Sequence, residues 1–179
     1  MAAATLPAVL AAGIWTGLGI AGQSAETAAA TTGLTARLSA AQEVPRPKGA
    51  RAGAQGTFSA AFVRSGAGGT LSWKLTFQGL TGKATASHIH VGVRGRAGAV
   101  RVSLCGPCRS GARGSAKVDA KTVTALLAGS TYVNVHTARN PAGEIRGQIV
   151  KSAKPPVVVP PTTQSTGTTT GTTEPYPGG

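Results

Sequence analysis

The sequence predicts an all-β domain, an antiparallel β-sandwich or barrel of about seven short strands with one short helix. Several runs of about five to eight residues alternate apolar with polar side chains, which is typical of half-buried strands. Glycine and proline separate these runs, and the chain of 179 residues contains 26 glycines. Both residue types favour turns between strands. A single segment spaces its apolar residues as a helix does.

Two runs form the best-defined hairpin of the predicted sheet. The run 70–77 alternates apolar with polar residues, so it should bury one face, which includes Trp73. The run 56–63 does the same with Phe58, and a glycine-rich turn joins the two strands. The remaining predicted strands are 34–40, 86–92, 100–104, 132–136 and 144–150.

The one predicted helix follows Asp119, whose carboxylate is suited to cap the first turn. Val123, Leu126 and Leu127 recur at helical spacing. Gly129 should end the helix, because glycine readily adopts the left-handed conformation found there. We therefore expect one short helix that packs on the sheet by its apolar side.

The two ends of the chain differ from this predicted domain at 31–151. Residues 1–30 begin with an apolar, uncharged run followed by small residues, which indicates a signal peptide cleaved after Ala25 or Ala30. No basic residue precedes the run, so an uncleaved N-terminal anchor remains an alternative, and it would be the only contact with a membrane. The Pro/Thr/Gly-rich tail 152–179 should be disordered. We therefore expect a secreted, extracellular or cell-surface protein.

The charge distribution predicts an anionic partner. The formal net charge is +13, and all 18 lysines and arginines lie between Arg37 and Lys154. Such a basic body favours an anionic cell-surface polymer or an extracellular protein, and the absence of a nucleic-acid-binding motif argues against specific nucleic-acid recognition. Five arginines in or near predicted loops are the candidate polyanion contacts: Arg94, Arg96, Arg101, Arg109 and Arg113.

The only two cysteines form a Cys-Gly-Pro-Cys sequence, as Cys105 and Cys108. In an exported chain this spacing favours a small structural disulfide that closes a loop. A redox dithiol would need a helix starting at the first cysteine, and the sequence shows no helical pattern there. Metal binding and free thiols are the remaining alternatives.

All three histidines of the chain fall in strand-like runs. His88 and His90 share a strand face because they are two residues apart, and His136 lies in another predicted strand. If the strands are neighbours, the three rings converge as a copper or zinc site with one open coordination position. The alternative is a structural role, in which each ring binds a backbone carbonyl or Asn134.

Other polar residues near the histidines are candidate supports of the site. Glu144 and Arg146 are two apart and could form an ion pair that fixes the end of the sheet. Asn140 precedes a proline in a predicted turn, and Asn134 shares a strand with His136. All four residues are predicted to support the metal ligands or to hold the adjacent turn.

Three functions follow from these observations: a binding module, a metal-binding or storage protein, and a metalloenzyme. Beyond the candidate ligands, no residue is identifiable as a general base, and no Gly-x-Ser-x-Gly nucleophile sequence is present. The sequence therefore favours binding over catalysis.

The domain resembles the CHRD family, which is named after repeats in the extracellular protein chordin. The resemblance covers about residues 34–150 and implies an extracellular all-β domain without an established catalytic activity. Arg46 departs from the family pattern, in which a second proline often follows the first. The matching motifs are Glu-Val-Pro at 43–45, Gly-Leu-Thr-Gly at 79–82, Ala-Ser-His-Ile-His-Val-Gly at 86–92, and the runs 132–137 and 140–148.

Overall fold

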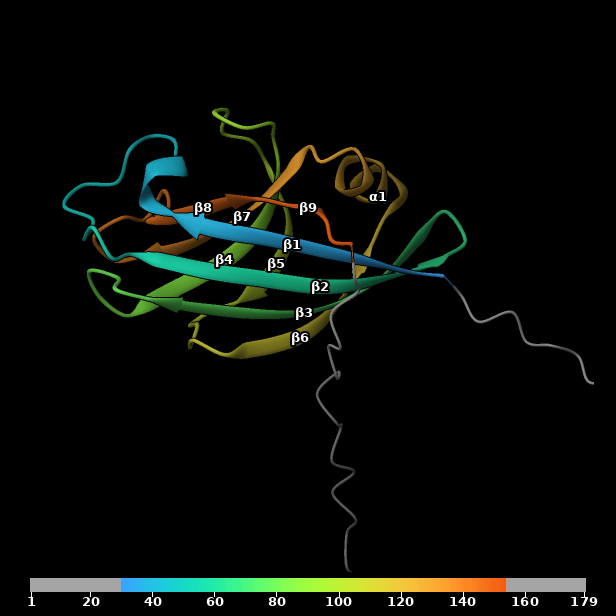
Figure 1. The fold of residues 1–179 in the computed structure, drawn as a ribbon, viewed down its shortest axis with the longest axis horizontal. Helices are drawn as coiled ribbons and strands as arrows, with labels where there is room; N and C mark the ends of the chain where they lie inside the picture. Colours follow the sequence, from blue (N-terminus) through green and yellow to red (C-terminus); the bar gives the residue numbers. More distant parts are fainter. Residues whose placement is uncertain (1–29, 154–179) are drawn as a thin grey trace, which may run out of the picture.

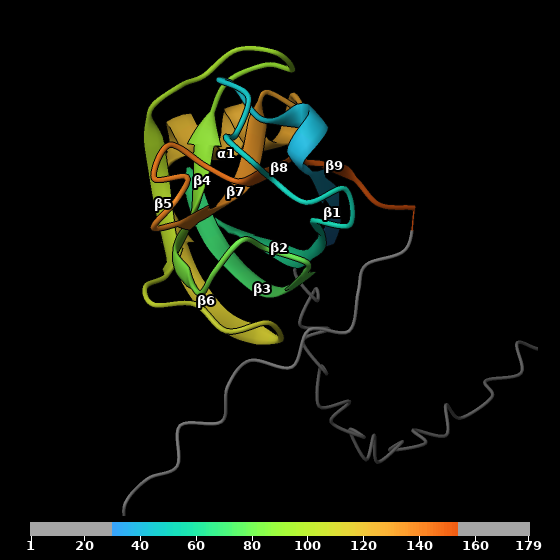
Figure 2. The same cartoon turned by 90° about the vertical axis from the view of Figure 1, so that its left-hand side faces the viewer.

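Nine β-strands form one strongly curved antiparallel sheet in the computed structural model, which describes residues 30–153 (Figures 1 and 2). Along the sheet the strands run in the order β5-β4-β7-β8-β1-β2-β3-β6, and the short β9 also pairs with β1. The edge strands β5 and β6 come close together, so the sheet is a nearly closed barrel. The elements are β1 (Thr31–Ser39), η1 (Ala40–Gln42), β2 (Gln55–Ser65), β3 (Gly68–Gln78), β4 (Ala84–Val91), β5 (Val100–Cys105), β6 (Ala112–Val118), α1 (Ala120–Leu127), β7 (Thr131–Thr137), β8 (Ile145–Gln148) and β9 (Val150–Lys151).

The predicted all-β class is confirmed, but the strand count of about seven was too low. The missed strand is β6, whose inward positions hold alanine and glycine until Val118 at its end. Gly114 is small because the Trp73 ring of β3 lies against it: a Cβ there would be 2.5 Å from Trp73 Cζ2. The last predicted strand is also divided into β8 and β9 at Ile149.

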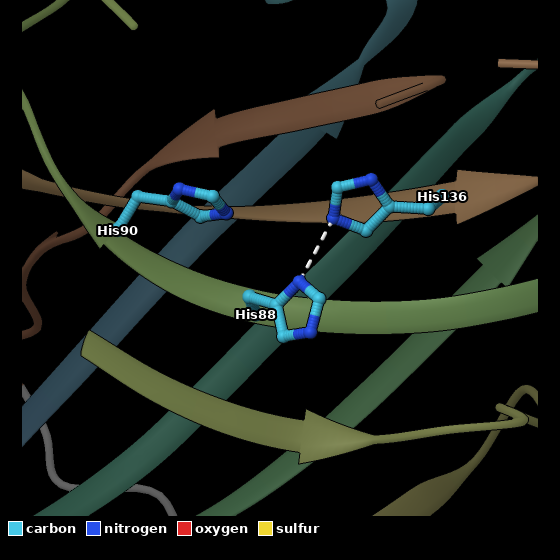
Figure 3. Close-up of side chains that lie close together, drawn as sticks. All are labelled: His88, His90 and His136. Carbon is cyan, nitrogen blue, oxygen red and sulfur yellow. Dashed lines mark hydrogen bonds between the residues drawn. The ribbon is translucent and has the colours of Figure 1, made fainter. Parts of the chain in front are cut away.

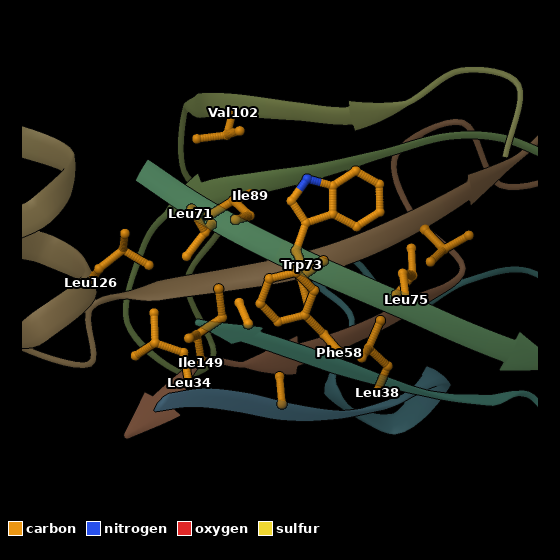
Figure 4. Close-up of a cluster of buried hydrophobic side chains, with 14 of the residues drawn as sticks. Leu34, Leu38, Phe58, Leu71, Trp73, Leu75, Ile89, Val102, Leu126 and Ile149 are labelled. Atoms are coloured by element: carbon orange, nitrogen blue, oxygen red, sulfur yellow. The ribbon is translucent and has the colours of Figure 1, made fainter. Parts of the chain in front are cut away.

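The predicted hairpin of β2 and β3 supplies much of the core. The two strands pair along their whole length, from Gln55 opposite Gln78 to Ser65 opposite Gly68. Their inward side chains include Phe58, which is fully buried (Figure 4). Burying a phenylalanine stabilises a fold by about 1.5–3 kcal/mol. The core lies inside the barrel, so chemistry-bearing side chains must lie on its outer surface or at its ends.

Helix α1 closes one end of the barrel, as the sequence predicted. Asp119 caps it, because the backbone N of Thr122 donates to Asp119 Oδ1 at 2.7 Å. Gly129 follows the helix with a φ of +70°, the left-handed conformation that ends many helices. Leu126 points from α1 into the core beside Leu71 and Ile149 (Figure 4).

Strand β7 is buried at all seven positions, which distinguishes it from the half-buried strands of the barrel. Val133 and Val135 face the core. The alternate residues face outward, where the β4–β5 loop (92–99) and the chain after β1 cover them. Gly98 lets this loop lie close to the end of β4, because any Cβ there would overlap the backbone of Val91. The outer side of β7 is therefore a covered polar region outside the barrel.

Cys105 at the end of β5 and Cys108 in the β5–β6 loop lie at disulfide-bonding distance, in agreement with the predicted loop closure. The predicted signal peptide or anchor and the predicted tail lie outside the described residues, apart from Ala30 and residues 152–153. Within the part of the chain that the structure describes, no helix is long and apolar enough to cross a membrane.

Candidate metal centre

Strands β4 and β7 bring the three histidines together on the outer side of the barrel. The strands are antiparallel neighbours, with His90 opposite Tyr132 and His88 opposite Asn134. Ile89 points into the core between the two β4 histidines. His136 lies on the same outer side, and Figure 3 shows the three rings facing a common space. The predicted convergence is confirmed.

The ring nitrogens are spaced closely enough for one ion. His88 Nδ1 and His136 Nε2 are 3.0 Å apart, and one nitrogen of each of the three rings lies within 4.8 Å of the others. Around a tetrahedral ion with metal–nitrogen bonds of about 2.0–2.1 Å, ligand nitrogens are about 3.3 Å apart. The His88–His136 pair already has this spacing. The third ligand nitrogen, on His90, lies within 4.8 Å of the other two.

Backbone carbonyls fix which nitrogen of two rings carries the hydrogen. His136 Nδ1 lies 2.9 Å from the carbonyl oxygen of Pro141, and His90 Nδ1 lies 2.8 Å from that of Gly98. A carbonyl only accepts, so both Nδ1 atoms donate, and each Nε2 keeps a lone pair. His88 Nδ1 then donates to His136 Nε2. His90 Nε2 is buried and has no hydrogen-bond partner among the described residues.

Burial keeps two of these rings neutral at physiological pH. It lowers the pKa of His88 and of His136, and the positive charge of neighbouring histidines adds to the effect. The hydrogen bond from His136 to Pro141 opposes the shift without reversing it. His136 is almost fully buried, whereas His88 is half-buried and gives the site its contact with solvent. Neutral imidazole is the form that binds metals.

An aromatic stack supports the third histidine. The His90 ring is stacked on Tyr132, with ring centroids 4.9 Å apart and an angle of 9° between the planes. Arg146, from the strand on the other side of β7, places its guanidinium carbon 3.4 Å from the centre of the same tyrosine ring. The backbone N of Gly98 donates to Tyr132 Oη. The stack and the loop together fix the orientation of His90.

Comparison with known proteins identifies the family of this domain. The sequence model of the CHRD domain matches residues 34–149. The chain belongs to the CHRD domain family. Domains of this family are typically extracellular. No curated protein and no solved structure matches the chain.

The Glu-Val-Pro motif of the CHRD domain places an acid beside this site. Glu43 is buried over Gly143 and next to Asn134. Burial raises the pKa of Glu43 to about 7, against the lowering effects of a hydrogen bond from the backbone of Val44 and the charge of Arg146. Among the described residues, six buried side-chain atoms lack a hydrogen-bond partner. Five of them lie in the covered polar region outside the barrel. These five atoms are Glu43 Oε2, His90 Nε2, Asn134 Oδ1, Arg146 Nη1 and Gln148 Oε1.

The expected ion pair between Glu144 and Arg146 was wrong. Strand β8 begins at Ile145, so Glu144 belongs to the preceding turn and does not share a strand face with Arg146. Glu144 accepts hydrogen bonds instead from Thr81, Thr137 and Asn140. Burial alone would raise the pKa of Glu144, but these hydrogen bonds outweigh it and lower the pKa.

Asn140 therefore supports the turn rather than the histidines. Its Oδ1 accepts from the backbone N of Lys48 at 2.7 Å, and its Nδ2 donates to Glu144. This network joins the Gly-Leu-Thr-Gly motif to the β7–β8 turn through Thr81. Two of the four predicted supporting residues, Asn134 and Arg146, do lie on the outer side of β7 and β8, opposite each other.

The five candidate polyanion arginines are all exposed, but they do not all lie in loops. Arg94 and Arg96 lie in the β4–β5 loop, and Arg94 Nη1 donates to Gln42 Oε1 at 2.8 Å. Arg109 lies in the β5–β6 loop, whereas Arg101 is in β5 and Arg113 is in β6. Their role in binding stays a prediction.

The sequence interpretation missed Tyr132 and Glu43 as parts of the site. Tyr132 was recognisable, because it alternates with Asn134 and His136 along one strand and so shares their face. Glu43 was noted only as part of a motif. It is distant from the histidines in sequence, and nothing in its local pattern shows which part of the sheet it covers.

Proposed function

We propose that this CHRD domain is an extracellular metal-binding module that holds one copper or zinc ion through His88, His90 and His136. The observation that supports it is the convergence of three imidazole nitrogens within 4.8 Å. Imidazole nitrogen is a preferred ligand of both metals. Three protein ligands leave a coordination position for water or for a small ligand.

The surroundings of the rings suit a metal ion. Two carbonyls orient His90 and His136 with a lone pair toward the shared space, as in many metal sites where a second hydrogen bond fixes the ligand ring. The buried, unpartnered His90 Nε2 would gain a partner on metal binding. The cysteines are paired with each other, and the three imidazoles are the ligand groups that converge. When bound, the ion would supply Lewis acidity or, as copper, one-electron chemistry.

Metal titration of the metal-free protein tests this proposal. Isothermal calorimetry with Cu(II) and Zn(II) should give about one ion per chain, and Mg(II) should not bind because it prefers oxygen ligands. Electron paramagnetic resonance of the Cu(II) form should show coupling to ring nitrogens. The substitutions His88→Gln, His90→Gln and His136→Gln should each weaken binding by about tenfold or more.

The control is Thr85→Ala, an exposed position on the strand that carries two of the ligands. This variant should bind metal as the parent does. Because His136 is buried, its variant also needs a check of folding by circular dichroism, whereas His88 is half-buried and its variant should stay folded. A parent that binds neither metal, or a folded His88→Gln variant that binds as tightly as the parent, would overturn the proposal.

Family membership and the N-terminal sequence support the proposed extracellular placement. Residues 1–30 combine an apolar run with the small residues that precede signal-peptidase sites. N-terminal sequencing of the protein recovered from the medium should find cleavage after Ala25 or Ala30. A chain that stays in the cytoplasm with Met1 intact would contradict this placement.

A further inference from the structure

The side of the barrel away from the histidines carries a basic surface. Strands β1, β2, β3 and β6 lie side by side there (Figure 1). Their inward residues fill the core, and their outward residues are mostly exposed or half-buried hydroxyl, amide and basic side chains, with Ala61 and Val63 of β2 among them. We call this surface the basic face, and we define it by Arg37, Thr57, Ser59, Ser72, Lys74, Thr76, Arg113, Ser115 and Lys117.

No acidic side chain balances the basic face. The described part of the chain contains 17 of the 18 basic residues but only three acids. Glu43 and Glu144 are buried elsewhere in hydrogen-bonded clusters. Asp119 caps α1, where the nearby charges of Arg101 and Lys121 help to lower its pKa. The positive potential of the face is therefore uncompensated within the described residues.

The register of β3 and β6 sets two of these cations directly against each other. Lys74 is the cross-strand partner of Arg113, and like charges in this position destabilise a sheet. Four residues further along β6, Lys117 Nζ donates to Thr70 Oγ1 at 2.9 Å. A bound anion between Lys74 and Arg113 would relieve their repulsion.

A groove at one end of the basic face offers neutral polar groups beside the cations. Its volume is about 540 Å³. Arg37, Thr57 and Thr76 belong to both the face and the groove, and the cross-strand pair Gln55 and Gln78 adds two amide groups to the lining. Amide and hydroxyl groups both donate and accept hydrogen bonds, as the hydroxyl groups of a sugar do. Phe77 adds an apolar contact.

We propose that the basic face binds an anionic polysaccharide, with its sulfate, phosphate or carboxylate groups on Lys74, Arg113 and Lys117 and a sugar ring in the groove. Stacking of nucleic-acid bases is not favoured, because the one aromatic residue at the face or groove, Phe77, is half-buried against the core. Of the five arginines predicted from the sequence as polyanion contacts, only Arg113 belongs to this face.

Binding to dextran sulfate tests the charged part of the proposal. With metal-free protein in chelator, the parent should bind dextran sulfate and not neutral dextran. The triple variant Lys74→Gln, Arg113→Gln, Lys117→Gln should bind at least about tenfold more weakly. It should also lower the slope of log affinity against log salt by about 2 to 3, because each lost contact releases about 0.7–0.9 fewer counterions.

A matched control separates the basic face from net charge. The variant Arg46→Gln, Arg51→Gln, Lys121→Gln loses the same charge at exposed positions off the face and should retain the affinity of the parent. An equal loss in both triple variants would overturn the assignment of the site.

The double variant Gln55→Ala, Gln78→Ala tests the groove. It should weaken dextran sulfate binding and leave polyphosphate binding unchanged. If it changes neither, or if single-stranded DNA binds as tightly as dextran sulfate, the polysaccharide assignment is wrong.

Discussion

The buried carboxyl group of Glu43 makes a quantitative prediction about stability and pH. Glu43 is only 3% exposed. Its Oε1 accepts a hydrogen bond from the backbone N of Val44 at 3.0 Å, and Oε2 has no hydrogen-bond partner in the part of the chain that the structure describes. Burial raises its pKa from the ordinary 4.5 to about 7, although the charge of Arg146 partly opposes this. The folded protein thus holds the proton more tightly than the unfolded chain.

The sign of the effect follows from proton linkage. Because the pKa is higher in the folded state, Glu43 contributes its stabilisation fully below pH 4.5 and loses it as the pH rises through about 7. At about 1.4 kcal/mol for each pKa unit, the whole loss is about 3 kcal/mol. The substitution Glu43→Gln resembles the protonated acid at every pH. It should match the parent near pH 4 and exceed it by about 3 kcal/mol near pH 8.

Urea unfolding followed by tryptophan fluorescence, at pH values from about 4 to about 9, measures this difference. The difference between the parent and Glu43→Gln isolates Glu43, since the histidines titrate in both proteins. Glu144→Gln is the matched control: its pKa is lowered, so that variant should fall below the parent as the pH rises. A parent that gains stability over Glu43→Gln with rising pH would refute the reasoning, because Arg146 would then outweigh burial.

Three further predictions concern the site and the core. Metal affinity should be nearly constant above neutral pH and fall only as the pH drops below the ordinary histidine pKa of about 6.5, because burial lowers the pKa of His88 and His136. Calorimetric titrations at several pH values measure this. Gly143→Ala should cost more than about 1 kcal/mol of unfolding free energy, because Gly143 has a φ of +135° and a Cβ would meet Glu43; urea unfolding would show it. Phe58→Ala should cost about 3–5 kcal/mol by the same method, because Phe58 is fully buried.

The strands that could be predicted are those with large apolar residues at alternate positions. In β2 and β3 the apolar residues lie on the face that the alternation indicated. Strand β6 was not predictable, because its inward positions before Val118 hold only glycine and alanine, which give no alternating hydrophobic signal. Strand order is also non-local: β1 pairs with β8 and β9 from the far end of the domain.

The histidine site was predictable up to one condition. The two-residue spacing of His88 and His90 placed both on one strand face. Convergence with His136 also required β4 and β7 to be neighbours, and His88 and His136 are 48 residues apart in sequence. The Glu144–Arg146 prediction failed because it assumed a continuous strand, and the strand begins one residue too late. Alternation is informative only inside a strand, so side chains at strand ends are the least predictable part of such a site.

The structural and the metal-binding interpretations of the histidines are parts of one arrangement. The carbonyls of Gly98 and Pro141 hold the loop and the turn by accepting from His90 and His136, which is the expected structural role. The same two bonds place the hydrogen on Nδ1 and direct each Nε2 lone pair to the shared space. Only His88 must change on metal binding: its Nδ1 donates to His136 in the metal-free site, and moving that hydrogen to Nε2 frees both nitrogens. A neutral imidazole makes this exchange without gaining or losing a proton, so the scaffold that stabilises the metal-free fold is already arranged to accept the ion.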